Sequence, residues 1–157
     1  ETLGPVTRKP HLAFLSELVA DAVEKGAKLL TGGKPLGGAG HFFEPTVLTE
    51  VDHSMRLMKE ETFGPVIGIQ KVKGDEEALK LMNDTVYGLT AAVYCKDVER
   101  GRKLVELVDA GTGYVNCCDR VSPYLPWSGR GHSGLGSTLS LHGIYAFTKP
   151  RGLHLRT

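Results

Sequence analysis

The stretch from residue 65 to residue 116 alternates between strand-like and helix-like segments, and this order most restricts the folds open to the chain. Strand-like segments lie at 65–73, 89–94 and 113–116. The segments between them place apolar residues at spacings of three and four, which is typical of a helix with one buried face. Strands alternating with helices predict an α/β fold with a mostly parallel sheet and flanking helices. We expect the carboxyl ends of these strands, including Asn116, to share one edge of the sheet.

The remaining segments flank this unit. Residues 11–25 are predicted to form a helix, because Pro10 suits a first helical position and Gly26 suits its end. Its expected apolar stripe consists of Leu12, Leu15, Val19, Ala22 and Val23. Asp75 and Asp97 are expected to cap the two later helices. Further expected elements are a strand at 27–31, an extended segment at 42–51, a helical turn at 139–145 and a terminal strand at 149–156.

Charge and cysteine content exclude several classes of protein. Nineteen basic residues against eighteen acidic ones leave a net charge of +1, which does not favour electrostatic binding to nucleic acid. No apolar run approaches the ~20 residues that span a bilayer. The three cysteines, Cys95, Cys117 and Cys118, do not form a disulfide framework, and reduced thiols predict a cytoplasmic location.

Three local patterns are candidate sites. Residues 129–134 fit G-x-G-x-x-G, but no strand precedes them and no acidic residue follows about 20 positions later, so a turn is favoured over a dinucleotide loop. The six histidines are scattered, and we expect no metal site. Cys117 and Cys118 follow a strand, where a nucleophile can lie, but a buried apolar role is favoured for them.

Residues 60–66, Glu-Glu-Thr-Phe-Gly-Pro-Val, form the most unusual stretch. One interpretation is a charged turn that caps the following strand, with Phe63 in the core, and composition alone favours it. In the other, Glu61 accepts hydrogen bonds from a ribose diol, because a carboxylate only accepts and can take two bonds. Phe63 would then form the wall against a flat ring.

At this point the sequence resembles the NAD(P)-dependent aldehyde dehydrogenases. Residues 60–66 resemble that family's E-E-x-F-G-P-V segment. Four further blocks agree in order and spacing: 26–33 with GA-x-LL-x-GG, 83–89 with N-x-x-x-YGL, 110–116 with AG-x-x-x-VN, and 126–136 with PFGG-x-x-x-SG-x-G. The resemblance covers essentially all 157 residues.

The resemblance is to the C-terminal third of these enzymes. Their nucleophilic cysteine lies upstream in a GQ-x-C context, which this chain lacks together with the general base. We therefore expect no catalytic residue here, and, with no initiator Met, we expect a fragment that is inactive by itself. In the whole enzyme the resemblance implies oxidation of an aldehyde to a carboxylic acid through a cysteine thioester.

The resemblance implies supporting roles for five residues. Glu61 and Phe63 correspond to the positions beside the nicotinamide ribose, and the expected cofactor is NAD, with NADP not excluded. Asn116 corresponds to the floor of the active site, and Val121 and Trp127 to the substrate funnel. The sequence departs from the family at Trp127, where the usual residue is Phe.

Substrate and partners are also implied by the resemblance. An aromatic funnel suits an apolar aldehyde, whereas Arg120 and Arg130 would suit a semialdehyde such as succinate semialdehyde. We expect residues 1–147 to be part of the catalytic domain and 148–157 to be an oligomerisation strand in a homodimer or homotetramer. The alternative of another class is a non-catalytic interaction module that keeps the fold.

Overall fold

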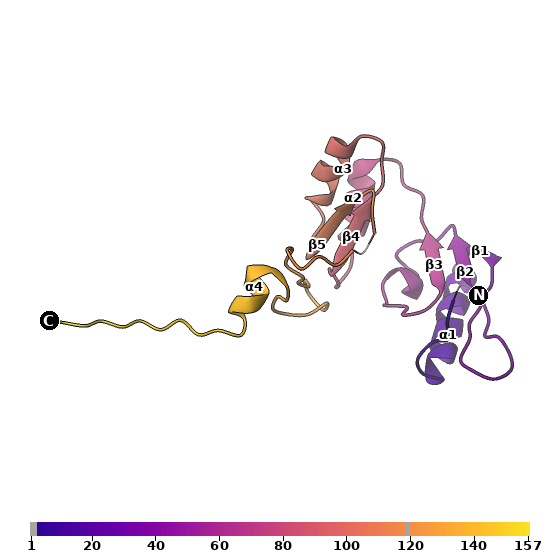
Figure 1. The fold of residues 1–157 in the computed structure, drawn as a ribbon. Coiled ribbons are helices and arrows are strands. Elements are labelled where there is room, and N and C mark those ends of the chain that lie inside the picture. Colours follow the sequence, from indigo (N-terminus) through magenta and orange to yellow (C-terminus); the bar gives the residue numbers. More distant parts are fainter. Residues whose placement is uncertain (1–2, 119) are drawn as a thin grey trace. The chain divides into compact units, whose positions relative to one another are not determined.

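The computed structural model describes residues 3–118 and 120–157, and the chain divides into two compact units, Glu1–Lys73 and Gly74–Thr157. Figure 1 shows the helices and strands of each unit. The catalytic-domain segment expected at 1–147 includes residues 1, 2 and 119, which lie outside the described residues. The boundary expected after residue 147 stays a prediction.

The first unit packs one helix against a three-stranded sheet. Strand order is β1-β2-β3, with β1 antiparallel to β2 and β2 parallel to β3. The elements are α1 (Pro10–Glu24), β1 (Lys28–Thr31), β2 (Thr46–Thr49), the 3-10 turn η1 (Arg56–Met58) and β3 (Val66–Ile69).

Helix α1 begins and ends where the sequence predicts. Pro10 is its first residue, and Gly26 follows its end with a φ of 104°, a conformation that glycine adopts without strain. The buried face includes Leu15, Val19 and Ala22 as expected, but Val23 is 45% exposed and Leu18 is buried instead. Leu18 lies three residues after Leu15 and four before Ala22, so it fits the helical stripe better than Val23.

Strand β3 is parallel to β2, as a mostly parallel sheet predicts, but it lies at the edge of its sheet. Among the described residues it pairs with β2 alone, and Ile67 is 62% exposed because one face of this edge strand is uncovered. Consecutive strands of a chain are spatial neighbours only about two times in three. The alternation after residue 65 therefore predicted the α/β class correctly but not the pairing partner of β3.

The second unit is built on a parallel pair of strands covered by a helix. Strands β4 (Thr90–Val93) and β5 (Thr112–Val115) are in register from Thr90↔Thr112 to Val93↔Val115. Helix α3 (Val98–Val105) connects them and packs on both. The remaining helices are α2 (Asp75–Met82) and α4 (Ser140–Tyr145), the latter at the predicted helical turn.

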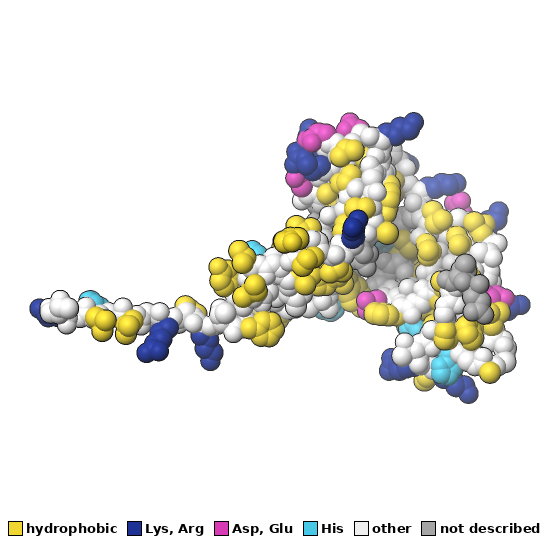
Figure 2. All heavy atoms as spheres, in the orientation of Figure 1, with side chains coloured by type: hydrophobic (Ala, Val, Ile, Leu, Met, Phe, Trp, Pro, Cys, Tyr) yellow, Lys and Arg dark blue, Asp and Glu magenta, His cyan; other side chains and the backbone are white. Residues whose placement is uncertain are grey.

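The two predicted caps have different outcomes. The Asp97 carboxylate accepts the Arg100 amide at 3.0 Å, which confirms the cap of α3. Asp75 is not a cap, because it lies inside α2 after an N-cap Gly74. Its carboxylate binds the Arg100 guanidinium at 2.9 and 2.5 Å instead, and this pair lowers the pKa of Asp75. Figure 2 shows the mixed acidic and basic side chains on the surface of this unit.

Residues 149–157 form neither helix nor strand, contrary to the predicted terminal strand. A strand needs a hydrogen-bonding neighbour, and no described residue of this chain provides one for the segment. Its pairing with another subunit stays a prediction. Among the described residues, no helix is long and apolar enough to cross a bilayer.

Candidate functional site

The loop before β3 is fastened at several points within the first unit. The Arg56 guanidinium donates to both oxygens of Glu60, at 2.6 and 3.0 Å, and lowers the pKa of that carboxyl. His11 contacts the carbonyl oxygen of Thr62 through Nε2 at 2.7 Å. The Pro65 carbonyl accepts the Thr46 amide at 2.8 Å, which joins the loop to β2. Three contacts from different elements therefore hold a loop of six residues.

A close packing contact adds to this restraint. A Cβ at Gly64 would lie 2.6 Å from Cδ1 of Leu15, a completely buried residue of α1. Only glycine lets the loop approach the helix this closely. The Gly-Pro step of the motif is thus explained by packing on α1.

With the loop held by these contacts, two of its side chains point outward. Phe63 has a left-handed φ of 43° and a side chain that is 76% exposed, and Glu61 is exposed beside it. The interpretation of Phe63 as a core residue is therefore wrong. A strained backbone and a solvent-facing aromatic ring are costs that the fold does not require, and such outliers concentrate at functional sites.

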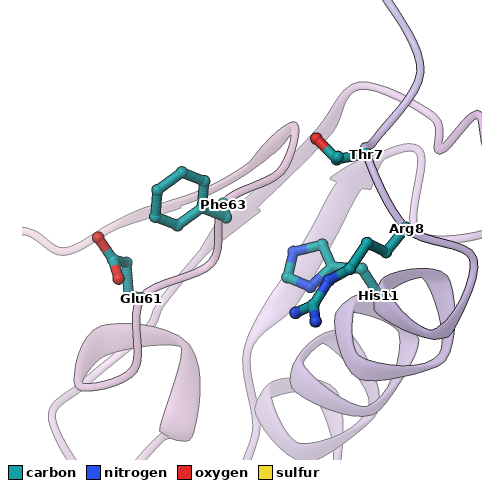
Figure 3. A pocket seen from close by; sticks show the side chains of 5 residues that line it. All are labelled: Thr7, Arg8, His11, Glu61 and Phe63. Atoms are coloured by element: carbon teal, nitrogen blue, oxygen red, sulfur yellow. The ribbon is translucent and has the colours of Figure 1, made fainter.

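Glu61 and Phe63 border one pocket with the start of α1. The pocket has a volume of about 300 Å³ and is lined by Thr7, Arg8, His11, Glu61 and Phe63 (Figure 3). An adjoining hollow of about 420 Å³ shares Arg8, His11 and Glu61 and adds Pro10 and Phe14. The structure thus brings together two residues of the loop and a helix start some fifty positions earlier.

The chemistry of this pocket suits a ligand that carries hydroxyl groups and a flat ring. Among the described residues the Glu61 carboxylate has no ion pair or hydrogen bond, so its acceptor sites are free. Arg8 contributes N–H donors on the opposite wall, whereas the Nε2–H of His11 is donated to the Thr62 carbonyl. A vicinal diol fits the carboxylate, and a planar ring fits the exposed face of Phe63.

Sequence reasoning missed Arg8 and His11. Neither belongs to a recognisable motif, and the loop residues that line the pocket with them, Glu61 and Phe63, lie about fifty positions later in the chain. An arginine just before a helix is common at protein surfaces, so no local signal would have identified it.

In the second unit Asn116 follows β5 and joins the ends of the two strands. Its side-chain oxygen accepts the Cys95 amide at 2.8 Å, and its side-chain nitrogen donates to the Cys95 carbonyl at 2.8 Å. Its own amide donates to Val93 at 2.9 Å. The amide group of Asn116 thus extends the strand pairing by one step, and its φ of 54° turns the chain out of the strand.

The two predicted funnel residues lie in the irregular segment after β5. Val121 is 58% exposed. Trp127 is half-buried, and its backbone forms a two-way bridge with Thr138, at 2.8 and 2.9 Å. Among the described residues no hydrogen bond joins Asn116, Val121 and Trp127 to one another, and all three belong to a different unit from Glu61 and Phe63.

The glycine-rich run at 129–134 is a turn that packs against residues 86–88, as predicted. The His132 amide donates to the Val86 carbonyl at 2.8 Å, and the Gly88 amide donates to Ser133 Oγ at 3.0 Å. Gly131 pairs with Tyr87 in an isolated bridge. These amides are engaged within the chain, which explains why this run carries glycines without being a dinucleotide loop.

The cysteines are free thiols, and Cys117 and Cys118 are both exposed, so the favoured buried role is wrong. Within the described part of the chain, no group of three or more histidine, cysteine or acidic residues could hold a metal ion.

Comparisons with known proteins identify the family. The sequence pattern of the aldehyde dehydrogenase family matches residues 1–152. The chain belongs to the aldehyde dehydrogenase family. An aldehyde dehydrogenase of Enchytraeus buchholzi is 40% identical over 154 residues, which are 98% of this chain and 31% of that protein. Aldehyde dehydrogenase 1A1 of Gallus gallus is 37% identical over 98% of this chain and 30% of its own length.

Solved structures of aldehyde dehydrogenases also match the fold of this chain. Lactaldehyde dehydrogenase of Escherichia coli matches with a TM-score of 0.92 at 32% identity, over 98% of this chain and 32% of that one. Betaine aldehyde dehydrogenase of Staphylococcus aureus, solved in complex with NAD+, matches with a TM-score of 0.87 at 34% identity, over 93% and 30%. The chain thus spans about 30% of the length of these aldehyde dehydrogenases.

Proposed function

We propose that this chain is the cofactor-facing and oligomerisation part of an NAD-dependent aldehyde dehydrogenase, with NADP not excluded. In this proposal Glu61 accepts hydrogen bonds from the nicotinamide ribose and Phe63 covers the ring beside it. The free carboxylate of Glu61 next to an outward-facing Phe63 is the observation that carries the proposal. A relative that matches 93% of this chain was solved with NAD+ bound, which supports the choice of cofactor.

In this proposal the residues of the chain position the cofactor for the reaction. When bound, the cofactor would accept the hydride that leaves the substrate. Glu61 fixes the ribose and thereby the distance over which the hydride moves, and Phe63 limits the tilt of the ring. The loop holds the backbone of both residues in place, because Glu60, Thr62 and Gly64 each contact another element. The nucleophilic cysteine and the general base belong to other parts of the enzyme.

For the substrate we propose an aldehyde oxidised to its carboxylic acid, with Asn116, Val121 and Trp127 lining its path. The semialdehyde alternative depends on Arg120 and Arg130 as partners of a second carboxylate. Arg130 lies 3.7 Å from Asp109 and 3.3 Å from Ser128 Oγ, so its guanidinium is already engaged. An apolar or aromatic aldehyde is therefore better supported.

The first test measures the rate of hydride transfer in the full-length enzyme that carries this chain. Glu61→Gln keeps the size of the side chain but removes its charge, so the ribose is held less firmly. Misplacement of the reacting atoms by about 1 Å can cost ~10²-fold in rate, and we expect a slower pre-steady-state formation of NADH with little change in aldehyde binding.

Glu24→Gln is the matched control, because Glu24 is an exposed carboxylate at the far end of α1. It should leave the NADH burst unchanged. A Glu61→Gln enzyme with a wild-type burst would refute the role of Glu61. A full-length enzyme that forms no NADH with any aldehyde would instead favour the non-catalytic module.

A further inference from the structure

Two thiols of the second unit lie exposed at the ends of its strands and have no role in the function proposed above. Cys117 and Cys118 come directly after Asn116, at the carboxyl end of β5, and neither is in a disulfide. Desolvation raises the pKa of the Tyr94 hydroxyl, which follows β4, and the Cys118 and Cys117 thiols raise it further.

The backbone leaves the extended conformation just before these two cysteines. In an extended strand successive side chains point to opposite faces. Here the chain leaves β5 at Asn116, whose φ of 54° bends it, and the bend continues through Cys117. The Asn116 side chain fixes this bend through its two hydrogen bonds to Cys95. The thiols are thus adjacent, accessible and held on a braced turn.

We propose that Cys117 and Cys118 form a dithiol site for trivalent organoarsenicals. A direct disulfide is disfavoured, because the Cα atoms of neighbours joined by a trans peptide are about 3.8 Å apart, whereas disulfides usually join Cα atoms roughly 4.4–6.8 Å apart. An atom inserted between the sulfurs relieves this constraint. Zinc would need four ligands, and the described residues offer no third donor here. An organoarsenical needs only two thiols, since its third bond is to its own carbon.

The reaction balances without an oxidant. A hydrated arsenoxide, R–As(OH)₂, forms two As–S bonds and loses two As–O bonds. The two thiol protons leave with the hydroxide groups as two molecules of water. Arsenic stays in its trivalent state, and both sulfurs keep the oxidation state of a thiol.

The test treats the full-length enzyme with phenylarsine oxide in the presence of excess 2-mercaptoethanol, followed by intact mass measurement and peptide mapping. A monothiol displaces arsenic from single cysteines, but the second thiol of a pair acts at a high effective concentration and resists it. We expect one adduct on the peptide that contains Cys117 and Cys118, which 2,3-dimercaptopropanol removes.

Variants separate this pair from the other thiols of the enzyme. Cys117→Ser and Cys118→Ser should each weaken retention of the adduct by ~10²-fold or more. Cys95→Ser is the control and should retain it, because the Cys95 thiol is directed at the Asp97 carbonyl, 2.9 Å away. Far-ultraviolet circular dichroism verifies that each variant is folded. Retention by Cys117→Ser or Cys118→Ser, or loss in Cys95→Ser, would overturn the proposal.

Discussion

At the scale of single residues, the site depends on side chains that hold the backbone as well as on Glu61 and Phe63, which face the pocket. His11 and Glu60 do not need to touch a ligand to matter, because their contacts keep the loop in one conformation. These contacts hold the backbone of Glu61 and Phe63 so that both side chains face the pocket. This division explains how an exposed phenylalanine can keep a left-handed φ.

Gly64 gives the clearest stability prediction at this scale. Gly64→Ala places a Cβ 2.6 Å from Leu15 Cδ1, and Leu15 has no free space because it is fully buried. Overpacking of this kind typically costs about 1–3 kcal/mol, and we expect a lower urea midpoint for the first unit. Gly37→Ala is the control, since a Cβ there meets no atom within 4 Å. Equal midpoints for the two variants would show that the loop tolerates displacement from α1.

At the scale of elements, the cap of α3 makes a separate prediction. The Asp97 carboxylate accepts the Arg100 amide, which would otherwise lack a partner at the helix start. Asp97→Ala should lower the free energy of unfolding of the second unit by about 1 kcal/mol, whereas Asp97→Asn should retain most of it, because asparagine caps equally well. Urea unfolding followed by circular dichroism measures both. A loss of equal size in the two variants would indicate that charge, and not the cap, matters.

Most elements of this chain could be predicted from local signals. Pro10, Gly26 and Asp97 marked helix ends because each acts on the backbone next to it. Strand pairing was harder to predict: β3 joins β2, and nothing within the sequence of β3 specifies that neighbour. Asp75 failed as a cap for a similar reason, because its distant partner Arg100 attracts its carboxylate.

The candidate site was predictable only in part. Glu61 and Phe63 were identified by their motif, and the structure places them on one pocket. The side of the pocket formed by Arg8 and His11 arises from tertiary packing of α1 against the loop. Such contacts depend on how elements meet, which local sequence does not encode.

At the scale of the whole molecule, the account predicts how subunits associate. Residues 149–157 have no partner strand among the described residues of the chain, and the side chains of Leu153 and Leu155 are exposed. Pairing with another subunit would satisfy their backbone groups and cover these leucines. We expect the full-length enzyme to be a homodimer or homotetramer and deletion after Thr148 to weaken it. Sedimentation of both forms at matched concentration is the measurement, and an unchanged mass after deletion would contradict this role.

The central claim is that the Glu61 carboxylate binds the nicotinamide ribose. It is tested most directly by the affinity of the full-length enzyme for NAD and for an analogue without hydroxyl groups on that ribose. We predict that wild-type enzyme binds the analogue more weakly than NAD and that this difference is smaller for Glu61→Gln, because a neutral amide holds the two hydroxyls less firmly than the carboxylate does. If Glu61→Gln loses as much affinity as wild-type enzyme when the hydroxyls are removed, Glu61 does not bind the diol and the account is wrong.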